Sequence, residues 1–189
     1  MKIDYLKKVM RFKLPAALLC VFLYILLHEL GHTIVLWSVG ADVTEFSLIK
    51  AHVLYEGGHW TNLSDRWMHL NGTLFPVIVI IIYMLFYKRE CTNRFYRIFS
   101  GFFLLMTIAS LLAWVVIPFL FTEGIAPKDD DVYKFLYNFT FDYPAWTVSV
   151  GAVIVIACCI FIAAKKGVIQ NVWTELKSVR NEARGLSDE

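Results

Sequence analysis

The sequence predicts an all-α membrane protein with about four transmembrane helices and a short interfacial β-hairpin after the first. Three observations lead to this prediction. The 189 residues are 58% hydrophobic and 18% charged, with a mean hydropathy of +0.59, whereas about half of a soluble domain is apolar. Four apolar segments are long enough for a bilayer core that requires roughly 20 residues. Basic residues gather beside these segments, as they do at the cytoplasmic ends of membrane spans.

We expect an integral, multi-pass membrane protein with one transmembrane domain of residues 1–164. Its spans are predicted at about residues 14–39, 67–87, 98–121 and 144–164. The first apolar run is too long for a signal-peptide core and has no small-residue cleavage site after it, so we expect it to be retained. Residues 165–189 form a polar tail, helical or partly disordered, with no evident chemistry.

The loop after the first span reads ADVTEFSLIKAHVLYEGG, in which apolar and polar residues alternate before Gly57-Gly58. This alternation is typical of a short hairpin. The unpaired edge of a sheet cannot face lipid, so we expect the hairpin at the membrane interface or against the bundle.

The distribution of charge predicts the topology. Basic residues precede the first span, connect the second and third spans, and follow the fourth. These three ends are therefore expected in the cytoplasm, and the loops of residues 40–66 and 122–143 outside. The net charge of +2 forms no basic patch, so no nucleic-acid partner is expected. Four cysteines show neither a disulfide framework nor a CxxC pair.

The first span contains the string HELGH, which is His28-Glu29-Leu30-Gly31-His32. Histidines four residues apart project from one face of a helix and can bind one metal ion, such as catalytic Zn²⁺. Glu29 flanks that position and is the candidate catalytic base for a water molecule. A buried histidine can simply be hydrogen-bonded. However, each ionisable residue in a span costs on the order of 2.5–3.5 kcal/mol, so the complete string favours a metal site.

HELGH in an early span, followed by GADVTEFSL, by a second span with Asn71-Gly72 in NGTLFP, and by downstream aspartates, resembles the site-2 protease family of intramembrane zinc metalloproteases. The likeness covers roughly residues 14–140 and is greatest to compact bacterial members without PDZ or CBS domains. It implies a zinc endopeptidase that hydrolyses a peptide bond in or near the transmembrane segment of a membrane-protein substrate. It also implies that the β segment helps to seat an extended substrate. Asn71 is then a candidate for positioning the substrate, with simple helix-entry chemistry as the alternative.

In that family an aspartate on a later helix completes the zinc site, usually in an Asp-Gly pair, whereas this chain has APKDDDVYKFL. We prefer Asp131 as the third ligand and Asp130 as the second choice, because Asp131 directly precedes an apolar segment expected to return to the bundle. At least one of the three aspartates is expected to be solvated. The other candidates are Asp129, Glu123, Asp142, His52, His59 and His69, of which His69 is kept in reserve.

Two questions stay open at this level. The charge pattern directs the metal site to the extracytoplasmic side, whereas the family generally places it toward the cytosol. The function also has alternatives. One is a membrane zinc peptidase of the prenyl-protein protease type, which normally has a longer chain and a glutamate ligand. The other is a non-enzymatic membrane assembly or immunity factor with a structural metal site, which four protein ligands would favour.

Overall fold

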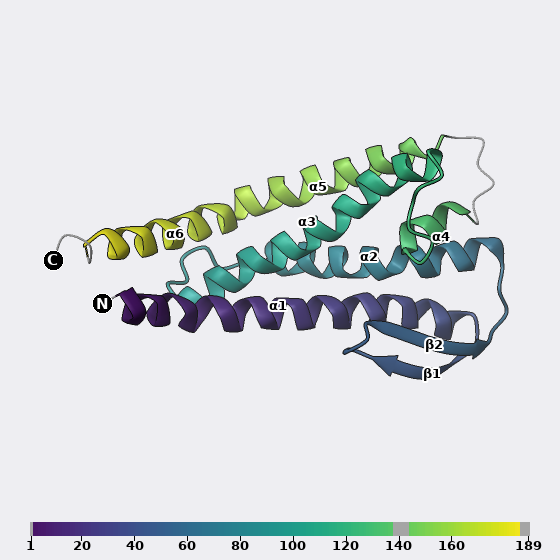
Figure 1. Cartoon of the computed structure of the whole chain (residues 1–189), viewed down its shortest axis with the longest axis horizontal. Helices are drawn as coiled ribbons and strands as arrows, with labels where there is room; N and C mark the ends of the chain where they lie inside the picture. Colours follow the sequence, from purple (N-terminus) through teal and green to yellow (C-terminus); the bar gives the residue numbers. More distant parts are fainter. Residues whose placement is uncertain (1, 138–143, 186–189) are drawn as a thin grey trace.

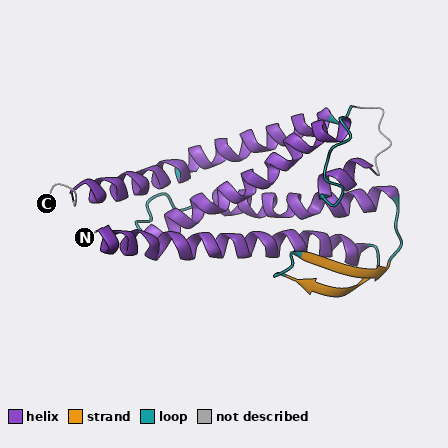
Figure 2. Ribbon diagram, in the orientation of Figure 1, coloured by secondary structure: helices purple, strands orange, loops and turns teal. Residues whose placement is uncertain are grey.

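The computed structural model describes residues 2–137 and 144–185, and the side chains of residues 12–137 and 144–178. Within these residues the chain forms six helices and one two-stranded sheet (Figure 1; Figure 2). In chain order the elements are α1 (Lys2–Ser38), β1 (Ala41–Ser47), β2 (His52–Gly57), α2 (Asn62–Leu85), α3 (Arg94–Thr122), α4 (Asp131–Tyr137), α5 (Trp146–Lys166) and α6 (Val168–Gly185).

Four helices among the described residues are long and apolar enough to cross a membrane: α1 from Phe12 onward, α2, α3 and α5. Their outer faces expose large apolar side chains such as Leu18, Leu105 and Phe161, which suit contact with lipid. The predicted fold class is therefore confirmed. The second helix begins earlier than the predicted span, because Thr61 and Ser64 form a capping box that starts α2 at Asn62.

The predicted hairpin is also confirmed. Strands β1 and β2 are antiparallel, with Ala41 opposite Gly57 and Ser47 opposite His52. Buried Leu36 at the end of α1, Ala41 in β1 and Met68 in α2 share one apolar cluster. The hairpin is thus packed onto the bundle at the end where the HELGH-bearing helix stops.

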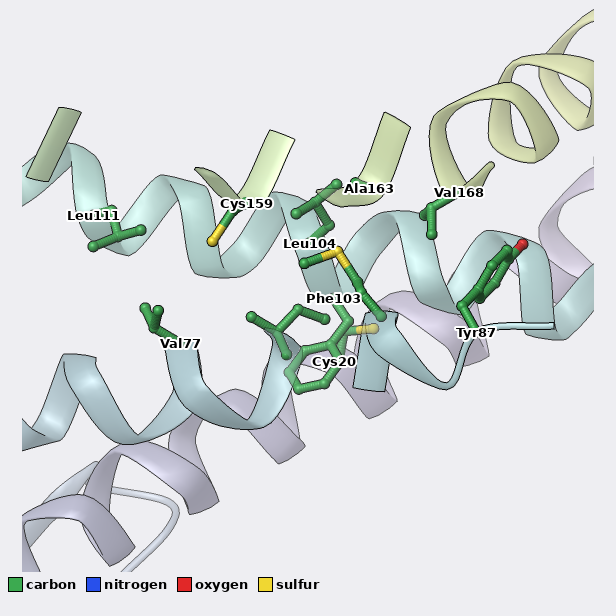
Figure 3. Close-up of a cluster of buried hydrophobic side chains, with 11 residues drawn as sticks. Cys20, Val77, Tyr87, Phe103, Leu104, Leu111, Cys159, Ala163 and Val168 are labelled. Carbon is green, nitrogen blue, oxygen red and sulfur yellow. The ribbon is translucent and has the colours of Figure 1, made fainter. Parts of the chain in front are cut away.

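A larger apolar core lies farther along the bundle, where α1, α2, α3, α5 and α6 meet (Figure 3). Cys20, Ile80 and Cys159 have 0% exposed surface there. Within the tail beyond residue 164, predicted to be a polar extension without evident chemistry, Val168–Gly185 form α6. This helix packs on α3 because Val168 and Val172 join the core on one face.

The two ends of the bundle differ. The chain termini, the α2–α3 connection and α6 lie at one end, and the hairpin and α4 lie at the other (Figure 1). The basic segments that the positive-inside rule assigns to the cytoplasm therefore share one end. Which side of the membrane that end occupies stays a prediction.

Candidate metal centre

The HELGH string occupies two consecutive turns of α1. The Nε2 atoms of His28 and His32 lie 3.1 Å apart, and their rings meet edge to face at 4.7 Å. The Glu29 side chain is 3% exposed and lies in the first of these turns. The helical spacing alone therefore brings two imidazole nitrogens together beside a buried carboxyl group.

Two glycines allow α1 and α2 to approach closely at this point. A Cβ atom on Gly31 would lie 2.2 Å from the backbone oxygen of Asn71, and one on Gly72 would lie 2.5 Å from Nε2 of His32. Gly72 thus leaves the space that the imidazoles occupy. Sequence reasoning noted Gly72 only as part of a motif, although a glycine within a span is a common sign of close helix packing.

Asn71 lies well inside α2, so the helix-entry interpretation of this residue is wrong. Its side-chain Nδ2 donates a hydrogen bond of 2.7 Å to the backbone oxygen of Gly31. This bond ties α2 to the HELGH turn of α1. The suggested role of Asn71 in positioning a substrate stays a prediction.

Asp131 reaches the histidines from the short helix α4, which packs against α2 and α3. Its Oδ2 atom lies 3.2 Å from Nε2 of His28 and 3.3 Å from Nε2 of His32. His28, His32 and Asp131 form a group whose ligand atoms could hold one metal ion. Two potential ligands from α1 are thereby joined by a third from a separate segment much later in the chain.

The donor set and its spacing fit a metal ion. In a tetrahedral site with metal–ligand bonds of about 2.0–2.1 Å, the ligand atoms lie roughly 3.3–3.4 Å apart. The three separations here are 3.1, 3.2 and 3.3 Å. Nδ1 of His32 lies 2.7 Å from the backbone oxygen of Met68, to which it can donate its proton. That bond leaves Nε2 of His32 free as a metal ligand.

The electrostatics of Asp131 also favour a ligand. Burial raises the pKa of its carboxyl group, but the imidazoles of His28, His32 and His69 together hold that pKa well below its ordinary value. The group is therefore a carboxylate at neutral pH, which is the form that binds a metal.

The remaining ligand candidates have other positions. Asp130 Oδ1 accepts a 2.8 Å hydrogen bond from the backbone N–H of Val132 at the start of α4, and Asp129 is exposed. Burial raises the pKa of the Asp130 carboxyl group. Glu123 and His59 are exposed, His52 pairs with Glu45 on the hairpin, and Asp142 lies outside the described residues. His69 contacts Asp131 and does not belong to the three-residue group.

The group faces a cavity of about 600 Å³ between α1, β2, α2 and α4. Glu29 lines this cavity together with His28, His32 and Asp131. Val53 and Tyr55 of β2 also line it. The arrangement therefore combines three potential ligands, a buried carboxyl group and room for a further molecule.

Comparison of the chain with protein-family models, with curated proteins and with solved structures finds no match. Inference about function therefore depends on the geometry of this centre.

Proposed function

We propose that the protein is an intramembrane zinc endopeptidase of the site-2 protease type, which hydrolyses a peptide bond in or near the transmembrane segment of a membrane-protein substrate. The observation that carries this proposal is the convergence of His28, His32 and Asp131 beside buried Glu29 in one cavity. These four residues line the cavity together with Val53 and Tyr55 of the hairpin strand β2.

Two imidazole nitrogens and one carboxylate oxygen are a donor set that catalytic zinc uses, and the HExxH spacing of the two histidines favours zinc as the metal. When bound, it supplies a Lewis acid that activates water and polarises a carbonyl group at neutral pH. Three protein ligands beside a cavity are typical of a catalytic site, whereas a structural zinc site normally has four. This count favours an enzyme over the non-enzymatic alternative.

Glu29 is the proposed general base. Glu29 lies within one helical turn of both histidine ligands, because His28 is its neighbour in α1 and His32 lies three residues later. A carboxylate there can take a proton from the attacking water and later give it to the amine that leaves. Its burial keeps bulk water from competing for that proton.

The substrate must arrive unwound. A peptide bond in a helix is shielded, and its N–H and C=O groups are paired within the helix. Strand β2 lines the cavity through Val53 and Tyr55 and offers a neighbour for an extended segment. We therefore propose that a short unwound stretch of a membrane-spanning substrate lies between β2 and the metal ligands.

The test measures zinc content and cleavage in the same preparations. The full-length protein is purified in detergent, reconstituted in liposomes with a panel of single-span substrates, and compared with Glu29→Gln and His28→Ala. We expect about one zinc per chain in the parent and in Glu29→Gln, cleavage only in the parent, and neither property in His28→Ala.

Glu45→Gln is the matched control, because Glu45 is a glutamate on the nearby hairpin that pairs with Lys50 and His52. This variant should retain zinc and cleavage. Full peptidase activity in Glu29→Gln would refute the proposed mechanism.

A further inference from the structure

We propose that His69 is a positioning residue of the metal centre, which binds one oxygen of Asp131 so that only the other oxygen is directed at the metal. This inference rests on the metal centre of the proposed function. It assigns to His69 a role other than that of a reserve ligand.

The two oxygens of Asp131 have different neighbours. Oδ2 faces the Nε2 atoms of His28 and His32 at 3.2 and 3.3 Å. Oδ1 lies 3.1 Å from Nδ1 of His69, on α2. One oxygen of the carboxylate therefore contacts the two histidines of the ligand group, and the other contacts the single imidazole of His69.

His69 is well placed to hold the carboxylate in one orientation. It is 7% exposed, so water competes little for its hydrogen bond. It also follows Met68, whose backbone oxygen lies 2.7 Å from Nδ1 of His32. Two adjacent residues of α2 therefore orient one ligand on α1 and one ligand on α4.

The chemical consequence concerns coordination number. A carboxylate can bind a metal through one oxygen or through both. With Oδ1 engaged by His69, Asp131 would offer Oδ2 alone to a bound metal, and His28, His32 and Asp131 would then supply one ligand atom each. Loss of the His69 donor would leave Oδ1 available as a second ligand atom, and the coordination number of a bound metal would then rise.

The test uses Co²⁺ as a spectroscopic substitute for the metal in the full-length protein in detergent. His69→Phe keeps a ring but removes the donor, and His69→Asn keeps an N–H near the position of Nδ1. His59→Phe is the matched control, because His59 is exposed and lies outside the ligand group. Visible absorption reports coordination number, since four-coordinate Co²⁺ absorbs much more strongly than five- or six-coordinate Co²⁺.

We expect the strong four-coordinate spectrum in the parent, in His69→Asn and in His59→Phe. His69→Phe should show a weak spectrum of higher coordination number and bind Co²⁺ about 10–100-fold less tightly, as for other residues that orient a ligand. Thermal unfolding without metal checks that each variant folds. If His69→Phe does not fold, His69→Leu replaces it, and retention of the parent spectrum in His69→Asn remains required.

The parent spectrum and affinity in the donor-free variant would overturn the inference. Equal losses in His69→Asn and in the donor-free variant would overturn it as well, because the hydrogen bond would then not be the cause. Failure of the parent itself to bind Co²⁺ or Zn²⁺ would instead refute the proposed metal centre. The two failures are therefore distinguishable.

Discussion

Two carboxylates in this bundle, Glu175 on α6 and Asp131 on α4, each contact side chains of other helices, and their surroundings differ. Glu175 of α6 is 7% exposed, and its oxygens lie 3.0 Å from Nη1 of Arg97 and 3.5 Å from Nε of Arg94. Asp131 of α4 is surrounded by three imidazoles and borders the 600 Å³ cavity. Both carboxylates join elements that are distant in the sequence.

The Glu175 cluster is a structural ion pair, whereas the Asp131 cluster is a set of potential metal donors. Arginine is always charged, so Glu175 has permanent counter-ions and needs nothing further. An imidazole carries no permanent charge and must be deprotonated to bind a metal. The Asp131 cluster therefore has the composition of a cation site, while the Glu175 cluster is a closed contact that anchors α6 to α3.

Removal of Asp131 is expected to have the largest effect on zinc affinity. Asp131→Ala should lower zinc affinity more than about 100-fold, because it deletes a ligand and not merely a neighbour of one. Asp130→Ala should keep its zinc and lose only the roughly 1 kcal/mol typical of a helix cap. Exposed Asp129→Ala should match the parent. Zinc per chain after dialysis measures all three.

A different ranking would reassign the ligand. Full occupancy in Asp131→Ala with loss in Asp130→Ala would move the third ligand by one residue. Full zinc occupancy in all three variants would mean that the third ligand is another residue, with Glu123, Asp142 and His69 as the next candidates.

A methyl group added to Gly72 or to Gly101 tests whether crowding at each site affects zinc affinity or only stability. Gly72→Ala should displace an imidazole and reduce zinc affinity about 10–100-fold, since its Cβ would lie 2.5 Å from Nε2 of His32. Gly101→Ala is the matched control, because its Cβ would lie 2.5 Å from the Cγ2 atom of Val172 between α3 and α6. That side chain can shift, so only about 1–3 kcal/mol of stability should be lost. Zinc titration distinguishes the two, and normal zinc affinity in Gly72→Ala would contradict the proposed packing.

The smallest effect on the metal should come from Glu175→Gln. This change leaves Arg94 and Arg97 without their carboxylate. It should lower the free energy of unfolding by about 1–3 kcal/mol, less than for a fully buried pair because Arg94 is partly exposed. Zinc content should equal that of the parent. Thermal unfolding and metal analysis of one detergent preparation measure both, and loss of zinc would mean that the two ends are coupled.

The features that sequence reasoning captured are local ones. Helical spacing suffices to place His28 and His32 on one face of α1, and alternation with two glycines suffices to predict the hairpin. The place of Asp131 directly before an apolar segment favours it as the third ligand, and α4 begins at this residue. The contact between Asp131 and the histidines spans many residues, and no periodic pattern encodes such a contact.

The features that sequence reasoning missed depend on tertiary packing. The need for a glycine at position 72 follows from how α1 crosses α2, and the contact between His69 and Asp131 follows from how α4 returns to α2. Glu175 lies in the segment predicted to be a polar tail, helical or partly disordered, with no evident chemistry. Its only sequence signal was the apolar spacing of Val168 and Val172, which predicts one buried face of a helix.

The division of the ligands between α1 and α4 also has a consequence for biosynthesis. About 100 residues separate His32 from Asp131, and at roughly 5–20 residues per second their translation takes about 5–20 seconds. During that interval the nascent chain holds the HELGH helix without Asp131, the proposed third ligand. The three-residue group is complete only after α4 has emerged and docked on α2 and α3, so the proposed metal would bind to it only when most of the bundle is in place.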